Sequence, residues 1–395
     1  MMNNEKGLGK GSVKTVYEQL FVINENENDA NMAQSEKMQK NYQNIRRHDC
    51  FALSLTTLLL GGTFIASFCI GRYGVALEDV VKSLYKGFQY VLWLLENVFG
   101  GNQPQPVRLD SSEDIVVWLV RMPRILAAIL VGGSLAFSGA TYQGLFRNPM
   151  VSPDILGAAA GASVGACIMM LFYQNNAMIQ SGAFVVGIVA VIFSYLLSKV
   201  ISRGSNATLI LVLCGMTVNA LFQSFVSIIK YIADPESQLP EMTYWLMGSI
   251  AKVDYEDLKF FFATFIVGTL PVLLLRWRLN ILSMGEDEAK SMGVNISRTR
   301  LICIVCATLL TASVVSFAGT IGWVGLMIPH LARFIVGPNN KVLLPMSLLA
   351  GSLFMLVIDN ICRTLLPYEI PLGVLTSLLG APFFIYILYK KKGGE

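Results

Sequence analysis

Long apolar runs dominate this sequence and constrain its fold more than any other feature. A helix that crosses a membrane needs about 20 predominantly apolar residues. Runs of that kind, some of them shorter, recur from residue 51 to residue 389: Phe51–Ile70, Ile125–Gln143, Leu156–Tyr173, Ala183–Val200, Leu209–Ile229, Phe260–Leu275, Leu301–Ala318, Ile321–Val336, Val342–Ile358 and Pro371–Tyr389. We therefore expect an all-α polytopic membrane protein with about ten transmembrane helices.

The composition supports this class and excludes others. Of the 395 residues, 54% are hydrophobic and 14% are charged, whereas soluble domains carry about 25% charged residues. The net charge of +4 is small, and most Lys and Arg lie between the apolar runs, so the clustered basic face of a nucleic-acid-binding protein is missing. The seven cysteines are scattered, and the lone Cys303-x-x-Cys306 lies inside an apolar run, which predicts neither a disulfide framework nor a metal site.

Charge distribution also predicts the orientation and the domain organisation. Placing both termini in the cytoplasm puts the larger share of flanking Lys and Arg on the inner side, in agreement with the positive-inside rule. Residues 1–49 are rich in Asn, Glu, Gln and Lys, and we expect them to form a flexible cytoplasmic tail. Residues 50–392 are then the transmembrane domain, with a cytoplasmic loop at about 279–299.

Two arginines at the start of the second apolar run point to a partner. Arg121 and Arg124 are spaced i, i+3 on one helix face, with Pro123 suited to a first helical turn. A helix N-terminus disfavours cations, so this pair predicts that an acidic partner docks there. Anchoring to lipid headgroups is the alternative.

Two other polar patterns interrupt the apolar sequence. Asn219, Gln223 and Ser227 are spaced by four and share one helix face, and amides in hydrocarbon must face protein or water. They therefore line either a polar path or an interface of hydrogen-bonded helices. Between Gly285 and Gly293, the polar residues 286–290 predict a short helix that ends at the two glycines.

Four blocks of this sequence resemble the FecCD/BtuC-type permeases, the membrane subunits of type II ABC importers for ferric siderophores, haem and cobalamin. The blocks span residues 121–157, 284–293, 318–333 and 369–384. They include Arg121-Met-Pro-Arg124, Arg147-Asn148-Pro-Met and Glu369-Ile-Pro-Leu-Gly. The resemblance covers about residues 50–390 in order, and it implies a transport subunit without enzymatic activity.

The resemblance also implies roles for particular residues. Docking of an extracytoplasmic substrate-binding protein is assigned to Arg121, Arg124 and Arg363, and the translocation path to Asn219, Gln223 and Ser227. Coupling to the ATPase is assigned to Gly285, Glu286, Asp287, Ala289, Lys290, Gly293, Arg147 and Asn148. His330 follows a proline in a family pattern without a metal role, so no metal site is expected there.

The expected assembly contains two permease copies, as a homodimer or with a sister permease, two ATPase subunits and a binding protein, in the cytoplasmic membrane of a prokaryote. No cofactor is expected on this chain, because ATP and Mg belong to the ATPase. The expected cargo is a ferric siderophore, with cobalamin, haem or an oxyanion such as molybdate as alternatives.

Two other classes of protein are weighed against an importer. An ion-driven secondary transporter normally needs a carboxylate near the membrane midplane, and the apolar runs contain almost none. An intramembrane enzyme needs a metal constellation or a nucleophile with its base, but the chain has only two histidines and no HExxH motif.

Overall fold

A computed structural model describes residues 43–98, 111–173, 175–202 and 207–392, and these residues form helices and connecting loops without a strand. The chain divides into two compact units, residues 1–52 and residues 53–395. In the first unit only residues 43–52 are described, and they are helical. The predicted tail of residues 1–49 therefore lies almost wholly outside the described residues.

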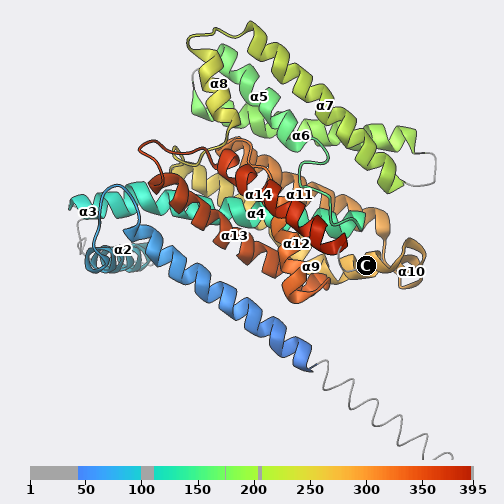
Figure 1. Cartoon of the computed structure of the whole chain (residues 1–395), viewed down its shortest axis with the longest axis horizontal. Helices are drawn as coiled ribbons and strands as arrows, with labels where there is room; N and C mark the ends of the chain where they lie inside the picture. Colours follow the sequence, from blue (N-terminus) through green and yellow to red (C-terminus); the bar gives the residue numbers. More distant parts are fainter. Residues whose placement is uncertain (1–42, 99–110, 174, 203–206, 393–395) are drawn as a thin grey trace, which may run out of the picture. The chain divides into compact units, whose positions relative to one another are not determined.

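The second unit consists of a series of helices (Figure 1). After the helix Gln43–Cys69 these are α2 (Leu77–Val98), α3 (Ser112–Ile115), the π-helix η1 (Val116–Arg121), α4 (Met122–Phe146), α5 (Ala158–Phe172), α6 (Asn176–Ile201), α7 (Ala207–Ile232), α8 (Gln238–Leu246), α9 (Tyr255–Met284), α10 (Glu286–Ser291), α11 (Ile296–Ala318), α12 (Val324–Val336), α13 (Asn340–Thr364) and α14 (Leu372–Lys392).

The helices confirm the predicted fold class. Among the described residues, seven helices are long and apolar enough to cross a membrane, and α5, α12 and Leu372–Ile387 of α14 are shorter apolar helices. Each of the ten predicted apolar runs coincides with one of these ten helices. The chain is an all-α polytopic membrane protein.

The start of the second predicted span is wrong. Ser111 caps the helix, its hydroxyl accepting a 3.2 Å hydrogen bond from the backbone N–H of Asp114, and Glu113 and Asp114 occupy the first turn. From there one continuous helix runs through α3, η1 and α4 to Phe146. Its wide π turn directly precedes Pro123, which lacks a backbone N–H. Arg121 and Arg124 therefore lie inside a helix and not at its N-terminus.

Helix α4 is the centre of one layer of helices. It packs against α9, α11, α12 and α13, and nearly all of its residues are buried (Figure 1). Small residues permit close contact, because a Cβ atom on Gly139 would lie only 1.8 Å from the carbonyl oxygen of Gly325. A Cβ atom on Gly165 of α5 would likewise lie 2.2 Å from the carbonyl oxygen of Gly182, so the small residues of both helices lie on packing surfaces. Helices α5, α6, α7 and α8 form a second layer, which α11 contacts through α5 and α6.

The two ends of α4 have different neighbours. Near its start lie the end of α13 and the α13–α14 loop, which carry Asp359 and Glu369. We name this region, with Arg121, Arg124 and Arg363, the arginine end. Near the end of α4 lie α10 and the first turn of α11. We name this region, with Arg147, the α10 end.

Candidate functional site

Buried ion pairs hold the arginine end together. Arg124 donates from Nε to Asp359 Oδ1 and from Nη1 to Glu369 Oε1, both at 2.8 Å. The other oxygen of Asp359 pairs with Nε of Arg363 at 3.1 Å, one helical turn away on α13. The carboxylate of Asp359 is 0% exposed, whereas the side chain of Glu369 is 39% exposed. Asp359 therefore compensates two buried arginines, and Glu369 closes the solvent side of one of them.

The remaining arginine contacts of this end go to backbone and amide oxygens. Arg121 donates to the carbonyl oxygens of Phe68 and Tyr73. Arg363 donates to the carbonyl oxygen of Ser67 and to Oδ1 of Asn360. The sequence pattern predicted docking from an unfavourable position at a helix N-terminus. That premise is wrong, because Arg121 and Arg124 lie inside a helix and have partners within the chain. The role of the three arginines in docking stays a prediction, since each is at least 91% buried in the single chain.

At the opposite end, α10 forms between the two predicted glycines. Gly285 separates it from α9, and Gly293, with φ +75°, follows its last turn. Ala289 is fully buried and its carbonyl oxygen accepts a 2.9 Å hydrogen bond from the N–H of Val294, which anchors the helix. Asp287 is almost fully exposed, with Lys290 at 3.3 Å. Helix α10 thus has one apolar anchor and a charged outer face.

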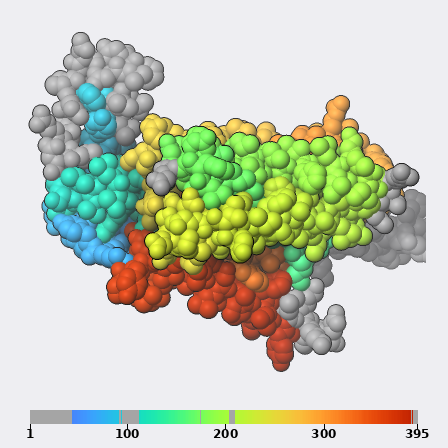
Figure 2. Space-filling view, turned by 90° about the horizontal axis from the view of Figure 1, so that it is seen from above, coloured from blue at the N-terminus to red at the C-terminus, as the bar shows by residue number. Residues whose placement is uncertain are grey.

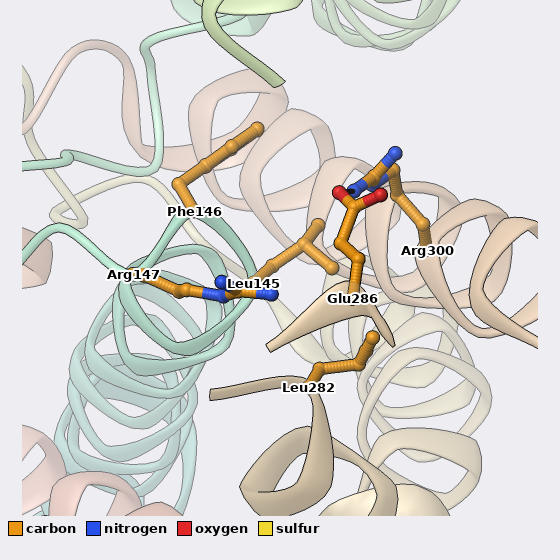
Figure 3. Close-up of a pocket in the computed structure, with 6 residues that line it drawn as sticks. All are labelled: Leu145, Phe146, Arg147, Leu282, Glu286 and Arg300. Atoms are coloured by element: carbon orange, nitrogen blue, oxygen red, sulfur yellow. Dashed lines mark hydrogen bonds and ion pairs between the residues drawn. The ribbon is translucent and has the colours of Figure 1, made fainter. Parts of the chain in front are cut away.

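The two regions predicted to contact the ATPase meet around one cavity (Figure 3). Arg147 ends α4 in a left-handed conformation, with φ +53°. With Glu286 it lines a cavity of about 190 Å³, whose other lining residues are Leu145, Phe146, Leu282 and Arg300. Arg300 Nη2 donates to Glu286 Oε1 at 2.8 Å, which ties the first residue of α10 to α11. Asn148 lies in the adjoining turn and accepts from the N–H of Met150 at 2.9 Å.

One face of α7 is polar and exposed, and Figure 2 shows this helix in yellow-green at the surface. Gln223 and Ser227 are exposed, and Asn219 is half-buried. The hydroxyls of Ser227, Thr217 and Ser224 donate to carbonyl oxygens one turn earlier, at 2.9 to 3.0 Å. Each hydroxyl is therefore satisfied within its own helix, so this face presents polar groups without depending on a neighbour.

Asn219 has a partner from another part of the chain. Its Nδ2 donates to Asp154 Oδ2 at 3.3 Å, while Oδ1 of Asp154 accepts from the backbone N–H of Ala159 at 2.7 Å. Asp154 lies in the α4–α5 loop, and its burial raises its pKa to about 6, although these two hydrogen bonds favour the charged form. Asp154 therefore links the first turn of α5 to the polar face of α7.

The described residues contain no group of three or more His, Cys, Asp or Glu side chains that could hold a metal ion. The sites are thus made of ion pairs, polar helix faces and a small cavity, which suit contacts with other proteins and passage of a solute.

Comparison with known proteins decides the family. The model of the FecCD transport family matches residues 58–390. The chain belongs to this family. It is 38% identical to the molybdate import system permease protein MolB of Haemophilus influenzae, over 86% of this chain and 95% of that protein. It is 35% identical to a probable iron chelatin transport system permease protein of Helicobacter pylori, over 87% of this chain and 97% of that one.

A solved structure agrees with this assignment. The fold matches a chain from an inward-facing conformation of a metal-chelate type ABC transporter with a TM-score of 0.72 and 37% identity. The match covers 86% of this chain and 98% of that one. This FecCD chain is therefore the permease subunit of a type II ABC importer.

The sequence patterns of this FecCD permease indicated residues at both the arginine end and the α10 end. The patterns did not predict several of the residues with which these pair. Asp359 was the detectable one, because it stands four residues before Arg363 on one helix, a spacing typical of ion pairs. Arg300 and Asp154 lie far in sequence from Glu286 and Asn219, and no local pattern signals those contacts.

Proposed function

We propose that this permease moves an iron complex, a ferric siderophore, from an extracytoplasmic binding protein into the cytoplasm. In this proposal the arginine end faces outward and receives the binding protein, and the α10 end contacts the ATPase. The observation that carries the proposal is the separation of two charged regions to opposite ends of α4, Arg124 with Glu369 at one and Arg147 with Glu286 at the other.

Energy enters through the α10 end. Two ATPase subunits bind ATP and Mg, and each contacts one permease copy through the outer face of α10 and the cavity beside Arg147. The buried Ala289 and the Glu286–Arg300 pair support this proposal, because they fix α10 to α9 and α11 so that a push on α10 reaches the transmembrane helices. ATP hydrolysis is supplied by the partner, and this chain is not an enzyme.

The translocation path is formed by two copies of the chain, with the polar face of α7 lining it. Support comes from the exposed Gln223 and Ser227 on a helix that is otherwise suited to a membrane. We place the assembly in the cytoplasmic membrane of a prokaryote, with both termini inside. A homodimer is the simplest arrangement, and a sister permease is the alternative.

The cargo proposal rests on relatives that are named for different cargoes. An iron chelatin permease and a hemin permease support an iron complex. MolB supports molybdate, and the vitamin B12 permease BtuC of Vibrio cholerae, 38% identical over 285 residues, supports cobalamin. The mostly uncharged polar face of α7 suits a large amphipathic complex better than a small oxyanion, and this favours an iron complex or cobalamin over molybdate.

Uptake by cells with and without the chain tests the proposal. Radiolabelled ferric siderophore, haem, cobalamin and molybdate are each supplied to cells that express the permease with its cognate ATPase and binding protein. We expect loss of siderophore uptake alone when the chain is removed. Loss of a different label corrects the cargo. Uptake that an uncoupler abolishes while cellular ATP is held constant contradicts an ATP-driven importer and supports the ion-driven class.

A further inference from the structure

Glu369 and Asp359 both accept a hydrogen bond from the guanidinium of Arg124, but they differ in burial and in their number of ion-pair partners. We propose that Glu369 is a placeholder, whose position on Arg124 Nη1 is taken by a carboxylate of the docking protein when the two proteins associate. Arg124 keeps its Nε bond to Asp359 throughout. The inference rests on the proposed docking function of the arginine end. It adds that release of Glu369 exposes the Nη1 atom of the buried Arg124 to the docking protein.

The burial of the two carboxylates indicates which one can leave. Asp359 is 0% exposed, lies on α13 and pairs with both Arg124 and Arg363. Removing it would leave the buried Arg363 without a counter-ion and Arg124 with Glu369 alone, a change that is strongly destabilising. Glu369 is 39% exposed and lies in the irregular loop between α13 and α14. Because the carboxylate of Glu369 is already partly hydrated, its transfer from Arg124 to water costs less than the same transfer of a fully buried carboxylate.

The number of contacts points the same way. Among the residues that the structure describes, Glu369 forms an ion pair with Arg124 alone. Its release therefore breaks one interaction, and the freed carboxylate becomes hydrated. The incoming carboxylate forms an ion pair with the same nitrogen, so Nη1 of Arg124 has a carboxylate partner both before and after docking.

The charge of the cluster favours an acidic occupant. Arg121, Arg124 and Arg363 carry three positive charges against the two negative charges of Asp359 and Glu369, which leaves an excess of one positive charge. Arg72, whose Nη2 donates to the carbonyl oxygen of Leu366 at 3.5 Å, and Glu113 also lie at this end. Their opposite charges leave the excess at one positive charge. Such a site attracts a carboxylate on a protein surface and accepts it with guanidinium geometry.

Glu113 offers a matched control. It lies at the same end, where its carboxylate accepts a 3.5 Å hydrogen bond from the hydroxyl of Tyr73, and it makes no ion pair among the described residues. Glu113→Gln and Glu369→Gln remove the same charge with the same side-chain shape. A difference in binding affinity between the two variants is therefore due to the contact of Glu369 with Arg124 and not to the overall charge of the surface.

The experiment measures the Kd of the purified cognate binding protein for the full transporter, permease with ATPase, in nanodiscs. If Glu369 competes with the partner, Glu369→Gln tightens binding on the order of 3- to 10-fold, while Glu113→Gln changes it by less than about twofold. The gain disappears in the double variant Arg124→Lys, Glu369→Gln, because the lysine lacks the second nitrogen. Unchanged or weaker binding by Glu369→Gln overturns the inference.

Two further outcomes separate the inference from the proposed function. If the unaltered transporter does not bind the binding protein at all, the proposed docking role of the arginine end fails, whatever Glu369 does. Repeating the measurement in nanodiscs with only zwitterionic lipids tests whether an anionic lipid headgroup is the occupant. A gain that appears only with anionic lipid assigns the position to a headgroup and overturns docking by a protein carboxylate.

Discussion

The two ends of α4 use charge in opposite ways. At the arginine end, charged groups are buried and compensate one another across helices far apart in sequence, as in the Arg124–Asp359 pair. At the α10 end they are exposed, and the Asp287–Lys290 pair joins neighbouring turns of one short helix. The difference teaches that the charges at the arginine end are needed for stability, whereas those at the α10 end contribute little to it.

The largest expected effect comes from removing the shared carboxylate of the arginine end. Asp359→Ala leaves the buried Arg363 without a counter-ion and Arg124 with Glu369 alone, and it is expected to lower the free energy of unfolding by about 3–5 kcal/mol. Glu286→Ala, which breaks the Arg300 pair at the α10 end, is expected to cost about 1 kcal/mol or less. Denaturant unfolding of the purified permease in detergent measures both. Equal losses contradict the difference between the ends.

Between the two ends, α4 depends on close packing instead of charge. Gly139→Ala places a Cβ 1.8 Å from the carbonyl oxygen of Gly325 and is expected to destabilise the chain by about 2–3 kcal/mol. The same substitution at Gly62, where a Cβ meets nothing within 4 Å, is expected to be neutral or to stabilise the helix by up to about 1 kcal/mol. The thermal unfolding midpoint should fall for Gly139→Ala and stay or rise for Gly62→Ala, and an equal fall in both would falsify the packing of α4 on α12.

Asp154 gives a smaller effect that depends on pH. Its pKa is about 6 in the folded chain because the carboxyl is buried, and the ordinary value is 3.8. The folded state therefore binds the proton more tightly than the unfolded state, so stability is highest below pH 4 and falls as pH rises to about 6. Asp154→Asn removes this dependence, which amounts to about 2–3 kcal/mol between pH 4 and pH 7. Unfolding measured from pH 4 to pH 7 checks it, and parallel curves for the two proteins contradict the buried carboxylate.

The smallest effect on stability is expected at the outer face of α10. Exchanging the charges with Asp287→Lys and Lys290→Asp keeps the net charge and is expected to change stability by less than about 0.5 kcal/mol. If this face contacts the ATPase, the same variant loses most transport and most binding of the ATPase. Thermal unfolding and ATPase co-purification are measured on one preparation. Normal co-purification with normal uptake places the contact elsewhere.

The sequence predicts the parts of this fold that depend on local pattern. Hydrophobic runs locate the ten apolar helices, and the paired glycines at 285 and 293 locate α10, because both signals lie within a few turns of chain. The start of the second span was misplaced for a physical reason. A hydropathy pattern treats Arg121 and Arg124 as a boundary, whereas the folded chain compensates them internally.

Long-range partners are what the sequence could not supply. Arg124 and Asp359 are separated by 235 residues, and Asp154 and Asn219 by 65. Nothing in the residues around either member specifies the other, since many carboxylates and amides have the right chemistry. The polar face of α7 was predicted from its spacing of four, but its link through Asp154 to α5 follows only from the packing of the helices.

The most direct test is photo-crosslinking from both ends of one permease. A photoreactive amino acid is placed at Leu365 in the α13–α14 loop or at Asp287 on α10, in the full transporter with its cognate ATPase and binding protein. We expect Leu365 to capture only the binding protein and Asp287 to capture only the ATPase. Capture of both partners from one end, or of the ATPase from Leu365, would contradict the assignment of the two ends to separate partners.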